Sequence, residues 1–251
     1  MSFRTTAPYD LVICDIDGCL SPEDTSPMDV PNLERIAEHN RLAVGRRDRP
    51  LVTLCSGRPI AFVEAMTRLI QNDVLPAIGE NGVWLFDPAA NWFEMDPAIT
   101  PEHLEMVHEA SRYLSQRYAG EGVRLQPGKS AAVSLWHPQT EHLRSICPAI
   151  REEFARRDWP LRVSMTWYYI NCDLQFIDKA SGIRRLLEKT GVDVARTAGI
   201  GDTTSDRAIA ETVAHFTCPA NAAEEVKAWA HYVSPQAEAA GVADILTRLA
   251  E

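Results

Sequence analysis

Short apolar runs alternate with stretches of helical spacing near the start of the chain. The runs LVICDI (11–16) and PLVTLCS (50–56) are continuous, which is typical of strands buried on both faces of a sheet. Residues 32–44 and 60–70 carry apolar side chains three and four positions apart, as in amphipathic helices. We therefore predict the order strand, helix, strand, helix for this segment.

The same alternation returns after residue 177. Residues 180–192 have helical spacing and end at Gly191, a residue type that commonly follows the last turn of a helix. RTAGIGD (196–202) is a further strand, and short helices and strands alternate from there onward. Alternation at both ends predicts an α/β fold with one doubly wound parallel sheet, interrupted by the middle of the chain.

The middle of the chain is richer in strands. A hairpin is predicted over 83–95. One strand is predicted on each side of Pro127-Gly128, and two more strands are predicted within 161–177. Two helices lie among them, one opening with Thr100-Pro101 and one over about 139–157. We predict an inserted α+β cap domain at 83–176, within a core made of 1–82 and 177–251.

Composition narrows the class of protein. The 251 residues are 45% hydrophobic and 24% charged, as in ordinary globular proteins, and the net charge of −10 argues against a nucleic-acid binder. No apolar run approaches the ~18 residues of a membrane span, and the first residues lack a signal-peptide core, so no membrane association is expected. The six cysteines have no paired metal spacing and are predicted to be buried free thiols in a cytoplasmic protein.

Polar residues gather where strands end or helices begin. An open parallel sheet places its active site beyond the carboxyl ends of its strands. The residues in question are Asp15 and Asp17, Ser56 and Gly57, Lys179, and Asp202 and Asp206. Clustered carboxylates are costly unless something cationic binds them, so these residues predict a metal-assisted site rather than a solvated surface.

The chemistry of this set is coherent. The carboxylates suit Mg²⁺, which prefers hard oxygen ligands, and Ser56 and Lys179 suit phosphoryl oxygens. Asp15 can attack phosphorus to form an aspartyl-phosphate. Asp17 can donate a proton to the leaving oxygen and then take one from water. An isolated Asp-x-Asp is common on surfaces, but the whole set in this order predicts phosphoryl transfer.

At this point the chain resembles the haloacid dehalogenase (HAD) superfamily of phosphohydrolases. The motifs that carry the resemblance are DIDGCL (15–20), TLCSGRP (53–59), Lys179 in DKASGIRRLL, and GDTTSD (201–206). The stretches IGENGVWLFD (78–87) and CPANAAEEVKAWAHYVS (218–234) resemble the Cof-like, type IIB branch. That branch has a Rossmann-like core with an α+β cap inserted between the second and third motifs.

The resemblance implies a role for each matching residue. Asp15 would be the nucleophile and Asp17 the general acid and base. Phosphate would be held by Ser56, Gly57 and Lys179, and Mg²⁺ by Asp15, the main chain of Asp17, and Asp202, with Asp206 beside them. Asn81 and Asn221 would lie at the rim near phosphate or substrate. Two positions depart from the usual motifs, Cys19 for threonine and Ser205 for asparagine, and neither removes a carboxylate.

Two basic residues have open roles. Arg58 can contact substrate or form a structural ion pair. Lys129 follows Pro127-Gly128 at a predicted loop tip. There it either reaches an anionic or polyhydroxylated substrate or is a solvated turn lysine.

The expected function is Mg²⁺-dependent hydrolysis of a small soluble phosphate ester, a sugar phosphate or a phosphoglycolate-like molecule, by a monomer or homodimer. Asp17 favours a phosphomonoesterase over a dehalogenase, which has no leaving alkoxide to protonate. The alternatives are a sugar phosphomutase of the same superfamily and a non-catalytic, phospho-accepting signalling or scaffold protein.

Overall fold

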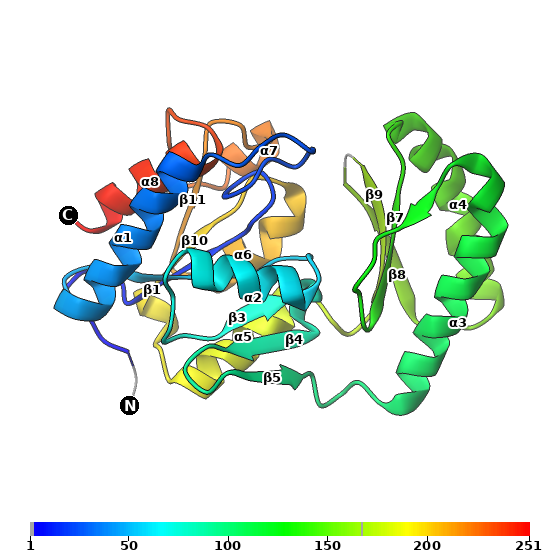
Figure 1. Ribbon diagram of the computed structural model, residues 1–251, viewed down its shortest axis with the longest axis horizontal. Helices are drawn as coiled ribbons and strands as arrows, with labels where there is room; N and C mark the ends of the chain where they lie inside the picture. Colours follow the sequence, from blue (N-terminus) through cyan, green and yellow to red (C-terminus); the bar gives the residue numbers. More distant parts are fainter. Residues whose placement is uncertain (1–2, 167) are drawn as a thin grey trace.

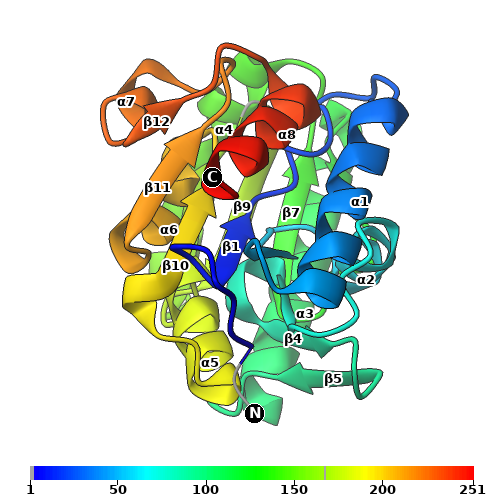
Figure 2. The ribbon, with the colours of Figure 1, turned by 90° about the vertical axis from the view of Figure 1, so that its left-hand side faces the viewer.

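A computed structural model describes residues 3–166 and 168–251, and it contains a core and a cap side by side (Figure 1). The core is built on a parallel five-stranded sheet of order β12-β11-β10-β1-β2. Its strands are β1 (Leu11–Cys14), β2 (Leu51–Leu54), β10 (Thr197–Ile200), β11 (His215–Cys218) and β12 (Tyr232–Val233). In Figure 2, β11, β10 and β1 lie side by side behind α8.

Helices cover both faces of this sheet. Along β1, Val12 and Cys14 lie in one buried cluster, while Leu11 and Ile13 lie in another on the opposite face. The first cluster includes α1 (Val30–Arg46), α2 (Ile60–Leu69) and α8 (Glu238–Leu249); the second includes α5 (Lys179–Thr190), α6 (Arg207–Thr212) and α7 (Glu224–Lys227). The predicted doubly wound sheet is confirmed, and burial on both faces explains why its strands read as continuous apolar runs.

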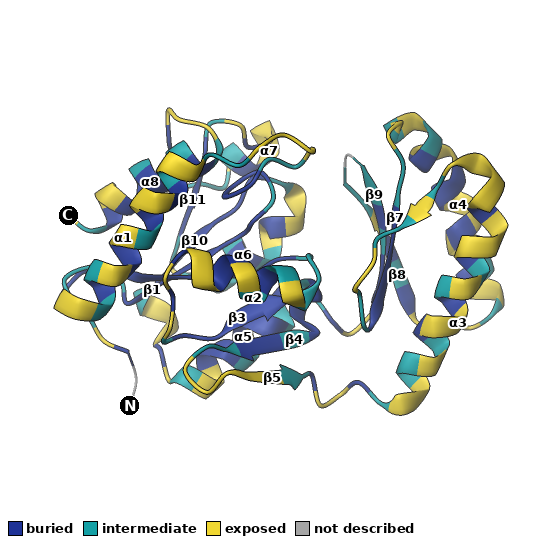
Figure 3. Ribbon diagram, in the orientation of Figure 1, coloured by how far each residue is buried: buried dark blue, intermediate teal, exposed yellow. Residues whose placement is uncertain are grey.

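The cap has an antiparallel four-stranded sheet of order β6-β7-β9-β8. Its elements are α3 (Pro101–Tyr118), β6 (Arg124–Leu125), β7 (Ala132–Trp136), α4 (Thr140–Arg156), β8 (Leu161–Met165) and β9 (Tyr169–Leu174). The two helices cover the side of the sheet that faces away from the core (Figure 1). Figure 3 shows that their outer surfaces are exposed while the strands are largely buried.

A third sheet bears on where the cap begins. It joins β3 (Ala77–Gly79), β4 (Trp84–Asp87) and β5 (Trp92–Met95) in antiparallel order. The hairpin β4–β5 was expected in the cap, but it pairs with β3 and packs against α2 and α5. Leu85 accordingly lies in a core cluster. We therefore propose to begin the cap after β5, because hairpin alternation alone does not say which sheet a hairpin joins.

Two other expectations can be compared with the structure. All six cysteines are free and buried, as predicted. Within the described ranges, no helix is both long and apolar enough to cross a membrane.

Candidate active site

The functional residues meet where neighbouring parallel strands end. Asp15 directly follows β1, and its main-chain N–H donates to the carbonyl of Ile200 at the end of β10 (3.0 Å). Ser56 lies just beyond β2, and its N–H donates to the carbonyl of Ile78 (3.0 Å). Asp202 follows β10 by two residues. The sheet therefore brings together residues nearly two hundred positions apart.

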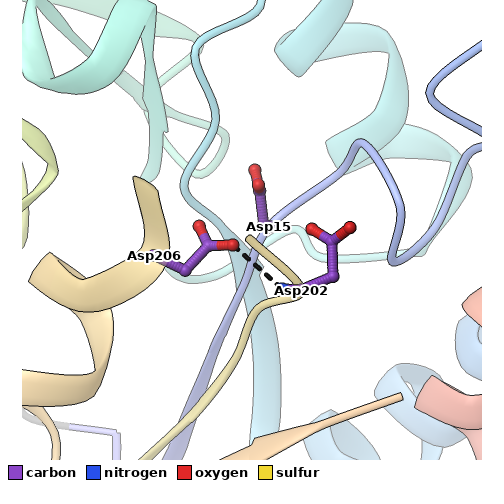
Figure 4. A group of neighbouring side chains, drawn as sticks. All are labelled: Asp15, Asp202 and Asp206. Atoms are coloured by element: carbon purple, nitrogen blue, oxygen red, sulfur yellow. Dashed lines mark hydrogen bonds between the residues drawn. The ribbon is translucent and has the colours of Figure 1, made fainter. Parts of the chain in front are cut away.

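A buried acidic cluster lies at this edge (Figure 4). Asp15, Asp202 and Asp206 are all buried, and each offers a carboxylate oxygen within 4.8 Å of the others. Lys179 joins them, with its Nζ 3.0 Å from Asp15 Oδ2 and 2.6 Å from Asp206 Oδ1. We call these four residues the floor of the site.

Local capping interactions fix the floor. Asp206 Oδ2 accepts the main-chain N–H groups of Asp202 (2.9 Å) and Thr203 (3.0 Å). Lys179 is the first residue of α5, and that helix begins at Asp178, whose carboxylate accepts the N–H of Ser181 (2.7 Å). An aspartate at an N-cap with serine three residues later is a sequence-encoded helix start, so the position of Lys179 follows from local sequence.

The floor carries more negative than positive charge. Burial raises the pKa of Asp202 to about 9, and the neighbouring carboxylates of Asp206 and Asp15 add to this effect. Burial and the charge of Asp206 also raise the pKa of Asp15 well above its usual range, although Lys179 opposes them. For Lys179, burial disfavours the charged form, but Asp15 and Asp206 together outweigh burial and raise its pKa. A bound cation would relieve this imbalance.

The floor fits a divalent cation. Asp202 Oδ1 is buried and has no hydrogen-bond partner among the described residues. Beside it, Gly18 has a left-handed φ of +71°, and a Cβ at that position would overlap the Asp202 carboxylate. Glycine therefore keeps the space around this oxygen open. Hard carboxylate oxygens of this kind suit Mg²⁺.

Asp17 lies above the floor, in an ion pair with Arg58. The Arg58 Nε donates to both Asp17 oxygens, Oδ1 at 2.9 Å and Oδ2 at 2.8 Å. The main-chain N–H of Arg58 donates to Ser56 Oγ (3.1 Å). Of the two roles that the sequence left open for Arg58, the structure shows the ion pair.

Lys129 reaches from the cap into the core. Its Nζ donates to the carbonyl of Gly57 (2.6 Å), so Lys129 is not a solvated turn lysine. Asn81 supports the same loop, since its N–H donates to the carbonyl of Ser56 (3.0 Å) and its Nδ2 donates to Asp173 Oδ2 in β9 (3.3 Å). The loop predicted to hold phosphate is thus held from both sides.

Asn221 differs from the expectation of a rim residue near substrate. Its Nδ2 donates to the carbonyl of Gly18 (2.8 Å), and its Oδ1 accepts the N–H of Glu238 (2.8 Å). It supports the loop after β1 and lies outside the residues that line the cavity. The sequence places Asn221 in the correct neighbourhood, but these backbone partners depend on the folded loop.

A cavity of about 290 Å³ lies between the floor and the cap. From the core it is lined by Asp15, Asp17, Gly57, Arg58, Asn81, Lys179 and Asp202, together with Glu23 and Thr203, Thr204 and Ser205. From the cap it is lined by Lys129, Met165 and Thr166, and by Gln126, Ser164, Tyr169 and Asn171. We call the last four residues the roof; sequence reasoning missed all of them. For Tyr169 and Asn171, the polar alternation with Asp173 along one strand is the signal that points to them.

Comparison with known proteins points to one family. A family profile described as haloacid dehalogenase-like hydrolase matches residues 129–246. Phosphoglycolate phosphatase of Methanopyrus kandleri is 26% identical over 96% of this chain and 97% of that protein. Over residues 129–246 the chain is similar to the haloacid dehalogenase-like hydrolases, and it resembles this phosphatase along almost its whole length. Three further relatives, all with phosphatase names, match over shorter stretches, and this chain spans between 32% and 46% of their length.

Solved structures share the fold of this chain. A protein of Thermoplasma acidophilum superposes with a TM-score of 0.75 at 20% identity, covering 96% of this chain and 98% of that one. A subclass IIB sugar phosphatase of the haloacid dehalogenase superfamily superposes with a TM-score of 0.63 at 16% identity, covering 95% and 98%. The predicted haloacid dehalogenase fold is therefore confirmed.

Proposed function

We propose that this haloacid dehalogenase-like hydrolase is a Mg²⁺-dependent phosphomonoesterase that acts through an aspartyl-phosphate on Asp15. The observation that carries the proposal is the floor itself, where buried Asp15 lies 3.0 Å from Lys179 beneath a cavity that the cap lines on the other side. The family and the relatives named as phosphatases confirm the enzyme class. The metal, the intermediate and the substrate are our proposal.

The first half-reaction forms a bond from Asp15 Oδ to phosphorus while the bond from phosphorus to the ester oxygen breaks. Lys179 and the loop of Ser56 and Gly57 hold the phosphoryl oxygens in line with Asp15. Mg²⁺, when held by Asp15, Asp202 and the main chain of Asp17, with Asp206 behind them, supplies positive charge that lets the anionic nucleophile meet the anionic phosphate.

Asp17 moves the protons. It gives one to the leaving oxygen and later takes one from the water that attacks the phosphorus of the aspartyl-phosphate, which frees Asp15 and inorganic phosphate. In the structure, Arg58 holds both Asp17 oxygens. Asp17 must therefore leave this ion pair, at least in part, to carry a proton.

We further propose a sugar phosphate or a phosphoglycolate-like molecule as substrate. The cavity of about 290 Å³ admits only a small ester. Similar proteins are a phosphoglycolate phosphatase and a sugar phosphatase, which supports this class. The free buried thiols support a reducing compartment such as the cytoplasm.

A phosphate-release screen tests the proposal. The purified protein is assayed with sugar phosphates, 2-phosphoglycolate and p-nitrophenyl phosphate, with Mg²⁺ and with EDTA. We expect Mg²⁺-dependent release with no isomerised product. Isomerisation without release would indicate a phosphomutase, and a stable phosphoprotein without turnover would indicate a phospho-accepting protein.

A further inference from the structure

One cross-strand row of polar side chains lies in the middle of the cap sheet. Asn171 in β9 pairs with Ser134 in β7 on one side and with Ser164 in β8 on the other. Gln126 continues the row, because its N–H donates to the carbonyl of Ser134 (2.8 Å). We call Gln126, Ser134, Asn171 and Ser164 the middle row.

The pleat of the sheet turns the middle row toward the core. The residues that alternate with it, among them Val133, Ile170 and Cys172, lie in the buried cluster shared with α3 and α4. Successive side chains of a strand point to opposite faces, so the middle row faces the site. Asn171 and Ser164 accordingly line the cavity.

Ser134 fixes the orientation of the Asn171 amide. Ser134 is buried, and its Oγ donates to Asn171 Oδ1 at 2.6 Å. The carbonyl end of the amide is therefore occupied. The NH₂ end of Asn171 makes no hydrogen bond to any described residue, so Asn171 presents a donor to the cavity.

The charge around the middle row argues against an anionic leaving group. The row itself carries no charge, and the next position of β9 on the same face is the buried carboxylate of Asp173. Lys129 is the cation that the cap contributes to the cavity lining, and its Nζ already donates to the carbonyl of Gly57. Burial lowers the pKa of Lys129, and the carboxylates of Asp173 and Glu80 oppose that effect by favouring its charged form. A leaving group with its own carboxylate would therefore meet no uncommitted cation among the described cap residues that line the cavity.

We infer that Asn171 is a specificity-determining residue that donates its amide N–H to a hydroxyl oxygen of an uncharged, polyhydroxylated leaving group, and that Ser134 is its positioning residue. This inference rests on the proposed phosphatase function. It selects sugar or polyol phosphates over phosphoglycolate.

The direct test replaces Asn171 by alanine. For a hexose 6-phosphate, kcat/KM of Asn171→Ala is expected to fall at least tenfold, because a hydroxyl loses its donor. For p-nitrophenyl phosphate, which has no hydroxyl, kcat/KM stays within about threefold of wild type. A series of monodeoxy hexose phosphates, each lacking one hydroxyl, gives a second readout. At least one of these substrates should have a lower kcat/KM than the parent hexose phosphate with the wild type, but the same kcat/KM as the parent with Asn171→Ala.

Ser134 is tested separately, because it does not line the cavity. Ser134→Ala is expected to raise KM for the hexose phosphate several-fold while kcat stays nearly unchanged. Ser134→Thr keeps the hydroxyl and is expected to have the KM of the wild type. Ser145→Ala is the matched control, since Ser145 is exposed on α4 and its Oγ donates to the carbonyl of His142 (2.7 Å). It should behave as wild type with every substrate.

The outcomes separate the inference from the function. If the wild type releases phosphate from no ester with Mg²⁺, the proposed function is wrong and the inference falls with it. If the wild type is active but prefers 2-phosphoglycolate to hexose phosphates, or if Asn171→Ala lowers kcat/KM equally for both test substrates, the inference alone is wrong. If Asn171→Ala does not fold, as judged by circular dichroism, the inference is tested with the two Ser134 variants and with the deoxy substrates on the wild type. An unchanged KM in Ser134→Ala, together with no loss for any deoxy substrate, would then overturn it.

Discussion

The floor and the roof line one cavity but are held in place by different means. On the floor, Lys179 contacts Asp15 and Asp206, and Asp206 in turn accepts two main-chain N–H groups. On the roof, the hydroxyl of Tyr169 makes no hydrogen bond to a described residue, and Asn171 is bonded only through its Oδ1. Asp15, Lys179 and Asp206 are therefore bonded to one another, whereas Tyr169 and Asn171 have groups available to a ligand.

This difference follows from the cost of burying charge. A buried carboxylate must be paired, so the floor fixes its own geometry before any substrate arrives. Uncharged side chains on a strand need no such pairing, because the sheet register alone positions them. On the proposed function, the floor carries out the reaction, and the roof selects the leaving group without disturbing the floor.

A short turn connects the two regions. Glu80 and Asn81 both have left-handed φ angles, 49° and 55°. The Glu80 carboxylate accepts the main-chain N–H groups of Ser130 (2.8 Å) and Ala131 (3.2 Å), just before β7 of the cap. The next residue, Asn81, donates to Asp173. Strained backbone of this kind persists only where the surroundings hold it in place.

The largest expected effect tests the floor. Asp15→Asn should abolish turnover with every substrate, because the amide has the same shape but is no nucleophile. Circular dichroism should be unchanged, and a phosphate-release assay measures the loss. Asp73→Asn, at an exposed position, is the matched control. Near-wild-type turnover in Asp15→Asn would remove Asp15 from its role as nucleophile.

Metal removal is the next test of the floor. EDTA should abolish phosphate release, and Asp202→Ala should raise the Mg²⁺ requirement strongly, because Asp202 Oδ1 is the buried oxygen without a partner. Asp206→Ala should raise the requirement less. Activity that persists in EDTA with all substrates would contradict a metal-dependent floor.

The floor also predicts how metal binding depends on pH. The pKa of Asp202 is raised to about 9, above the ordinary aspartate value of ~3.9. Between these two pH values the metal-free folded state therefore holds a proton that the unfolded state has lost. Its free energy of unfolding consequently falls as the pH rises from about 4 to about 9. Mg²⁺ must displace this proton. Its stabilisation in thermal melts should therefore be small at pH 6 and larger at pH 9. An equal shift at both pH values would show that Asp202 is not protonated in the metal-free floor.

Asp17→Asn should have a smaller effect, a loss of ~10²–10⁴-fold, which is the usual scale for general acid–base catalysis. The loss should shrink for p-nitrophenyl phosphate, whose leaving group needs little help from an acid. A hexose phosphate provides the comparison. Equal losses for the two esters would argue that Asp17 does not protonate the leaving oxygen.

The floor could be predicted from the sequence, because each of its residues lies next to a feature that the chain encodes locally. Asp15 ends an apolar strand, and Lys179 begins a helix capped by Asp178. A parallel sheet then brings these ends together. The order of strands and helices in the core was predictable for the same reason.

The roof could not be predicted in this way, because its residues owe their positions to register. Asn171 meets Ser134 across a strand pair, 37 positions apart in the sequence. In sequence, each is a polar residue in a short strand and looks like part of a solvated face. The hairpin β4–β5 shows the same limit, since its pairing with β3 lies across the turn at Glu80 and cannot be read from its own alternation.

The smallest expected effect concerns Lys129, the cap residue that bonds to the phosphate loop. The sequence alone placed Lys129 either at the substrate or in solvent, but its bond to the Gly57 carbonyl gives it a supporting role in the loop. Lys129→Ala should lower kcat/KM about tenfold for a hexose phosphate and for p-nitrophenyl phosphate alike, because the loop loses its support. It should also destabilise the fold by ~1–3 kcal/mol, since Asp173 and Glu80 lose their shared cation. Adding Asp173→Asn should recover part of that stability in denaturant melts. A loss confined to the hexose phosphate would instead assign Lys129 to the roof.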